Sequence, residues 1–135
     1  MCLALSAKGI ILLAHGSRLD EANSEVLGLA GRLAEKEGPE WYCGAAFLQG
    51  GSPDLDEAVK EAAAAGCGVV YVVPLFLTAG VHIRKDLPQM LARAGEANSG
   101  LELVQCRHLG CDPRLVHLIF ERVAEKMPDL SPGKG

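Results

Sequence analysis

The chain has 135 residues and a mass of 14.2 kDa, with 49% hydrophobic, 22% charged and 4% aromatic residues. This composition excludes a disordered, fibrous or membrane-spanning chain, and it predicts one soluble globular domain over residues 1–127 with a flexible tail over 128–135. The 13 Lys and Arg against 17 Asp and Glu give a net charge of −4, which argues against nucleic acid or an anionic membrane as a partner. An anionic ligand must therefore meet a local basic patch.

Short apolar runs alternate with segments of helical periodicity along the chain. The apolar runs predict buried strands at 9–14, 41–48, 69–73 and 101–106. Helices are expected to begin near Ser17, Ser52, His82 and Asp112 and to end near Gly38, Gly66, Gly95 and Lys126. Ser17, Ser52 and Asp112 are the predicted helix caps. This alternation implies right-handed crossovers, so we expect an α/β fold: a flavodoxin-like open parallel four-stranded sheet with helices on both faces.

Three of the four histidines follow predicted strands. His15 ends the first strand, His82 lies in the loop after the third, and His108 follows the fourth, whereas His117 lies inside the last helix. In an open parallel sheet the ligand crevice lies outside the carboxyl ends of the strands. One such histidine alone is best interpreted as a polar residue at a strand end, but three at one edge indicate a ligand site.

Basic and apolar residues surround these histidines in the sequence. Four basic residues lie within three positions of them: Arg18, Arg84, Lys85 and Arg107. They would collect positive charge for an anionic ligand, although ordinary ion pairing with nearby acidic residues explains them equally well. The loop after the third strand carries an apolar segment, here called the apolar lip, made of Leu75, Phe76 and Leu77. Gly80 in the same loop has no side chain, so a ligand could approach the backbone there. A broad, flat ligand would fit this edge, but Leu75 and Phe76 could equally extend a buried strand.

Imidazole both binds divalent metals and accepts protons near neutral pH, so two histidines on one rim indicate metal handling. A site with few protein ligands leaves the metal an open coordination sphere, which suits delivery more than retention. The five cysteines form no C-x-x-C pair, which predicts reduced thiols, small core residues and a cytoplasmic protein. A metal site between Cys106 and Cys111 would have the wrong spacing for a zinc finger.

The chain from about Gly9 to Val123 resembles the small CbiX-type sirohydrochlorin chelatases, and three motifs taken together carry this resemblance. They are Leu13-Ala14-His15-Gly16-Ser17-Arg18, then Ala46-Phe47-Leu48-Gln49 with Ser52-Pro53-Asp54-Leu55, and Val73-Pro74-Leu75-Phe76-Leu77 with Gly80, His82, Asp86, Leu87 and Pro88. Each motif alone is weak, and their order along the chain makes the set specific.

The resemblance implies a class II tetrapyrrole chelatase, a lyase that inserts a divalent metal into sirohydrochlorin without ATP. The metal would usually be cobalt, on the route to cobalamin, with nickel and iron as alternatives; it is a substrate, so no tightly bound cofactor is expected. His15 and His82 match the family's metal-binding histidines, and one of them would also accept pyrrole protons. The short form of the family builds its cleft by homodimerisation, and the helix that carries His117 is a candidate for part of that interface.

Gln49 departs from the family pattern, which commonly has Glu at this position. An amide oxygen is a weaker, neutral ligand and cannot act as a base near neutral pH. The alternative is therefore a non-catalytic metal-binding or tetrapyrrole-binding relative. A histidine phosphatase also places His-Gly after its first strand but needs Arg before the histidine, where this chain has Ala14. A flavin-binding module fits the fold, but no flavin-specific loop stands out.

Overall fold

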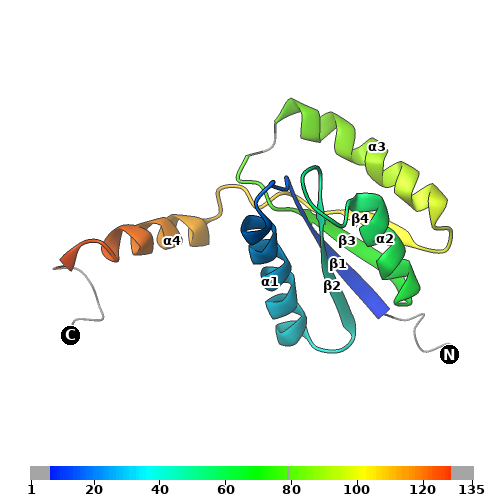
Figure 1. The fold of residues 1–135 in the computed structure, drawn as a ribbon, viewed down its shortest axis with the longest axis horizontal. Helices are drawn as coiled ribbons and strands as arrows, with labels where there is room; N and C mark the ends of the chain where they lie inside the picture. Colours follow the sequence, from blue (N-terminus) through cyan, green and yellow to red (C-terminus); the bar gives the residue numbers. More distant parts are fainter. Residues whose placement is uncertain (1–6, 79, 129–135) are drawn as a thin grey trace.

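The computed structural model describes residues 7–78 and 80–128, with His82 described by its backbone alone. Its centre is a parallel four-stranded sheet with the strand order β2-β1-β3-β4 (Figure 1). The strands are β1 (Ala7–Ala14), β2 (Trp41–Phe47), β3 (Cys67–Pro74) and β4 (Glu102–Gln105). Since this order is the one found in flavodoxin-like folds, the predicted α/β architecture is confirmed.

The four helices alternate with the strands: α1 (Asp20–Glu37), α2 (Leu55–Ala64), α3 (Val81–Ala97) and α4 (Pro113–Ala124). The chain moves from β1 to β2 in one direction and then from β2 through β3 to β4 in the other. Right-handed crossovers therefore place α1 on one face of the sheet and both α2 and α3 on the opposite face. The prediction of helices on both faces is confirmed.

The main core lies between the sheet and the pair α2 and α3. Ile11 and Leu13 of β1 and Val70 and Val72 of β3 are fully buried there, together with Leu87 of α3. These strand residues alternate along each strand, so their neighbours in sequence face α1. A smaller cluster on that second face joins α1 to β2. Residues of β1 belong to the clusters on both faces of the sheet, so the carboxyl end of this strand is packed on both faces.

Helix starts differ from the sequence prediction at two of the three proposed caps. Leu19 precedes α1, and the Ser17 hydroxyl instead accepts a hydrogen bond from the Leu19 N–H at 3.0 Å. Asp54 caps α2 in place of Ser52, in a reciprocal capping box with Glu57. Asp112 caps α4 as predicted. Helix α3 begins at Val81, so His82 lies in its first turn and not in the preceding loop.

Helix α4 extends away from the sheet and from the other helices (Figure 1). None of its residues is buried, although it is the most strongly amphipathic helix of the four. An apolar helix face normally covers another element, so this helix is incompletely packed within one chain. The predicted tail lies outside the described residues from 129 onward, as does Cys2. Within residues 7–78 and 80–128, no helix is both long and apolar enough to cross a membrane.

Candidate functional site

The side chain of His15 is exposed at the carboxyl end of β1 and rests on a buried aromatic ring. Its imidazole and the Phe76 ring have centroids 4.4 Å apart, with 36° between their planes. Phe76 itself is only 5% exposed, so its position is fixed by the surrounding chain. The imidazole thus has one face on a rigid support while its edge stays accessible to solvent and ligands.

The backbone around His15 is docked directly onto the loop that follows β2. The Leu48 N–H donates to the Ala14 carbonyl oxygen, just beyond the paired residues of β1 and β2. The Gln49 N–H then donates to the His15 carbonyl oxygen at 2.9 Å. Gly16 has a φ of 92°, and a Cβ at this position would lie 1.6 Å from the Gln49 carbonyl oxygen. Only glycine fits this contact, because it meets both the positive φ and the close approach.

Asn23 of α1 clamps the same two loops together. Its amide nitrogen donates to the carbonyl oxygens of Ser17 at 2.8 Å and Gly50 at 3.0 Å, and its amide oxygen accepts from the Ser17 N–H at 3.0 Å. Ser17 and Gly50 lie 33 positions apart in the chain, so this one side chain ties the loop after β1 to the loop after β2. His15 and Gln49 are consequently held next to one another.

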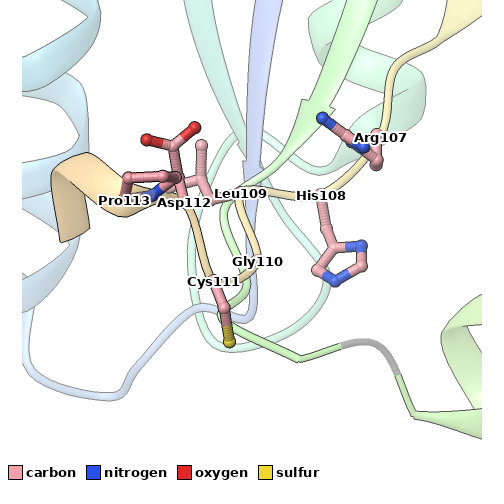
Figure 2. Close-up of a pocket in the computed structure, with 7 residues that line it drawn as sticks. All are labelled: Arg107, His108, Leu109, Gly110, Cys111, Asp112 and Pro113. Atoms are coloured by element: carbon pink, nitrogen blue, oxygen red, sulfur yellow. The ribbon is translucent and has the colours of Figure 1, made fainter. Parts of the chain in front are cut away.

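The loop after β4 lies at the same edge of the sheet. Arg107 to Pro113 line a pocket of about 310 Å³, and in Figure 2 the His108 ring and the Cys111 thiol extend to the same side of the loop. The Gly110 N–H donates to the Phe76 carbonyl oxygen at 3.2 Å, which connects this loop to the residue that supports His15. The structure therefore gathers His15, Gln49, Phe76 and the 107–113 loop at one edge.

Asp112 contributes to the fold of this loop more than to its chemistry. Arg114 donates from Nε and a terminal nitrogen to the two carboxylate oxygens, at 2.8 and 2.9 Å. The hydrogen bonds from the Arg114 side chain and backbone hold the pKa of Asp112 well below its usual range. The carboxylate is thus already engaged as the cap of α4 and as the partner of Arg114.

The remaining predicted charged residues lie on the surface of neighbouring elements. Arg18 is exposed in the loop between His15 and α1, and Arg84 and Lys85 are exposed on α3 shortly after His82. Gly80 precedes α3 and is exposed. His82 lies in the first turn of α3, just after the loop that follows β3, and the structure does not describe its side chain. Its role beside His15 therefore stays a prediction.

The apolar lip is divided between the core and the surface. Phe76 is buried and Leu75 is half-buried, whereas Leu77 is 56% exposed. Exposed apolar area that a flat ligand could cover comes mainly from Leu77. The buried face of this segment serves instead to support His15.

Three of the four described cysteines have thiols whose environment favours the neutral form. Burial raises the pKa of the thiols of Cys43, Cys67 and Cys106, with Glu37 adding to the effect at Cys43 and Cys43 to that at Cys67. A neutral thiol is a poor metal ligand, because the thiolate is the binding form. Among the described side chains, no three His, Cys, Asp or Glu residues are grouped closely enough to hold a metal.

Sequence reasoning proposed His15 and Gln49 as site residues but missed the contacts that hold them. In the sequence, Asn23 has no feature that distinguishes it from other polar residues of a helix. Its hydrogen bond to Gly50 joins residues 27 positions apart, which no local pattern indicates. The available signal for Gly16 was glycine directly after a strand-end histidine, which is typical of a tight turn. The support of His15 by Phe76 has no sequence signal at all, because the two residues lie 61 positions apart.

Substitution of Gly16 tests the docking of the two loops. Gly16→Ala should lower the free energy of unfolding by more than about 2 kcal/mol, because a Cβ collides with the Gln49 carbonyl and the positive φ is strained. Gly31→Ala is the matched control, since its Cβ would meet nothing within 4 Å inside α1 and should raise stability by about 0.5–1 kcal/mol. Urea unfolding of both variants at one protein concentration measures the difference. Equal stabilities would contradict the described contact.

Comparison with known proteins finds relatives that match most of this chain. The model of the CbiX family matches residues 9–126. The sirohydrochlorin cobaltochelatase of Methanococcoides burtonii is 32% identical over 127 residues, which cover 88% of this chain and 96% of that protein. The match thus extends over nearly the whole of both chains.

Solved structures show the same architecture. The CbiX protein of Marinobacter aquaeolei VT8 is 34% identical and superimposes with a TM-score of 0.75 over 90% of this chain and 98% of that one. The sirohydrochlorin chelatase SirB of Bacillus subtilis subspecies spizizenii, solved in complex with cobalt, has a TM-score of 0.78 over 88% of this chain. At 22% identity this second likeness shows the fold alone, and this chain spans half of the SirB length.

Proposed function

The chain belongs to the CbiX family, and we propose from that premise that it is a sirohydrochlorin chelatase that inserts a divalent metal without ATP. The observation that carries the proposal is His15, an exposed imidazole on a buried aromatic support at the carboxyl edge of the sheet. Cobalt is the proposed metal, in keeping with the relative named a sirohydrochlorin cobaltochelatase. Cobalt enters as a substrate, and the site needs no resident cofactor.

The reaction replaces two pyrrole protons by one metal ion. Both N–H bonds break, and each nitrogen keeps the electron pair and binds the metal. The two protons pass to bases or to water. A neutral imidazole accepts a proton near neutral pH, so His15 can take one of them. Phe76 fixes the ring, which lowers the cost of orienting this base toward the macrocycle.

His15 and His82 are the proposed metal ligands. Both belong to segments that leave the carboxyl ends of neighbouring strands, since β1 pairs with β3 in the sheet. Two imidazoles occupy few coordination positions, so the pyrrole nitrogens can enter before the protein releases the metal. Gln49 lies beside His15 and would add at most a neutral amide oxygen.

The acidic arms of the substrate need positive charge at the same edge. Arg18 is exposed next to His15, Arg107 lines the neighbouring pocket, and Arg84 and Lys85 lie on α3. Guanidinium groups bind carboxylates in a bidentate manner, which would fix the orientation of sirohydrochlorin. The flat ring system of sirohydrochlorin would face Leu77 and Gly80, which are both exposed.

A complete cleft is proposed to require two copies of the chain. This chain spans half of the SirB length, so a second copy would supply the equivalent of the other half. We therefore propose a homodimer. A cytoplasmic location is also proposed, supported by the four described cysteines, which are free thiols.

Removal of His15 should abolish the protein-dependent part of metal insertion. We expect His15→Ala to slow the change in the absorption spectrum of sirohydrochlorin with cobalt by at least about 100-fold, the usual scale for loss of a general base. His117→Ala is the matched control, because that exposed histidine lies on α4 and pairs with Glu121. The proposal fails if the unaltered protein is no faster than the protein-free mixture. In that case a carrier that binds without inserting metal remains.

Substitution of Gln49 tests whether this side chain faces the metal. Gln49→Glu adds a charged ligand beside His15 and should strengthen Co²⁺ binding roughly tenfold, a typical effect of groups that surround a metal. Gln89→Glu on the exposed surface of α3 adds the same charge elsewhere and should leave affinity nearly unchanged. Isothermal titration with Co²⁺ alone measures both. Equal affinities of the two variants would place residue 49 outside the metal site.

A further inference from the structure

The loop between β4 and α4 carries a histidine and a cysteine that the proposed reaction does not use. His108 is half-buried and Cys111 is exposed, and both line the pocket formed by this loop. Figure 2 shows the imidazole and the thiol on one side of the loop. Imidazole nitrogen and thiolate sulfur both bind divalent cations of borderline softness, so the two side chains are candidate metal ligands.

The backbone between the two residues allows their side chains to share one side. Gly110 has a φ of 64°, the left-handed conformation that glycine adopts in tight turns. Asp112 and Arg107 extend to the opposite side of the loop in Figure 2. The positive charge of Arg107 is thus directed away from His108 and Cys111, which favours a cation on their side.

Hydrogen bonds to the neighbouring strand hold the loop in this shape. The Cys106 N–H donates to the Val72 carbonyl oxygen at 2.9 Å. The Gly110 N–H donates to the Phe76 carbonyl oxygen at 3.2 Å, and Asp112 caps α4 at the end of the loop. Two ligands on a loop that is already ordered lose little conformational freedom when an ion binds.

The other metal-binding groups of this segment do not join His108 and Cys111. Burial raises the pKa of the Cys106 thiol, which disfavours the thiolate that binds metals. The Asp112 carboxylate already accepts two hydrogen bonds from the Arg114 side chain. The loop therefore supplies two ligands, and water would fill the other coordination positions, which favours capture and release over retention.

We propose that His108 and Cys111 form a second metal-binding site, which takes up a divalent cation of borderline softness such as Co²⁺. The Sγ–H bond of Cys111 breaks as the sulfur binds the ion, and the proton leaves to water. The imidazole binds the ion through the ring nitrogen that carries no proton. Binding at this pair does not depend on the proposed chelatase activity.

The pair is connected by one hydrogen bond to the residue that supports His15. Gly110 binds the Phe76 carbonyl, and the Phe76 ring lies 4.4 Å from the His15 imidazole between centroids. An ion released from the pair can therefore pass to the proposed site of insertion. This transfer rests on the proposed function, and it requires the pair to bind the ion less tightly than His15 and His82 do.

Cobalt absorption spectroscopy tests the pair directly. Co²⁺ bound to a thiolate has a charge-transfer band in the near ultraviolet that imidazole and amide ligands do not produce. Co²⁺ added to the reduced full-length chain, in excess of what His15 takes up, should produce this band. Cys111→Ser should abolish the band, and His108→Ala should weaken the binding at least about tenfold, the scale of losing a group around a metal.

Two further variants are the controls. Cys43→Ser removes a thiol of β2, and His15→Ala removes the proposed insertion ligand; both should keep the band. A band that is absent from the unaltered chain, or that survives Cys111→Ser, would overturn the proposal. Loss of the band in His15→Ala would also overturn it, since Cys111 would then belong to the site of His15. Far-ultraviolet circular dichroism checks that Cys111→Ser stays folded, as expected for an exposed residue.

The rate of metal insertion tests the transfer. At limiting Co²⁺, Cys111→Ser should insert cobalt into sirohydrochlorin several-fold more slowly than the unaltered chain, and excess Co²⁺ should reduce the difference. Equal rates at limiting Co²⁺ would contradict the transfer but not the binding. An unaltered chain without insertion activity would contradict the proposed function and the transfer together, whereas the absorption band would still decide whether the pair binds metal.

Discussion

The close contact between Gly16 and the Gln49 carbonyl is the constraint on which the site depends. It brings the chain after β1 directly against the chain after β2, and Asn23 then fixes both loops from α1. This contact fixes the backbone at His15, and the Phe76 ring contacts the His15 imidazole. A chemically ordinary side chain is thereby held at a defined point of the sheet edge.

This arrangement suits a protein whose metal passes through. The thiols of Cys67 and Cys106 have raised pKa values, and the Asp112 carboxylate is engaged by Arg114, so these three groups are poorly suited to hold a metal tightly. The imidazole of His15 is an exposed donor at this edge of the sheet. Weak, open coordination by histidine is consistent with delivery of a metal to a macrocycle that binds it far better.

The sequence predicted those features that depend on residues close together in the chain. Alternating apolar runs and helical spacing predicted the parallel sheet, and the edge rule placed His15 and the loop of His108 at the same edge, where Gly110 of that loop binds Phe76 under His15. The cap of α2 was also readable, because Asp54 has Glu57 three positions later, whereas Ser52 has Leu55. Contacts such as Asn23 with Gly50 join distant segments and leave no periodic trace.

Paramagnetic broadening by Co²⁺ tests the central claim most directly, because it locates the metal without requiring turnover. Two-dimensional spectra of the ¹⁵N-labelled chain, with substoichiometric Co²⁺ added, should lose the signals of His15, Gln49 and Phe76 first, together with those around His82. His117 on the distant α4 should respond last. Broadening centred on His117, or on Cys111 while His15 stays sharp, would contradict a metal site built on His15.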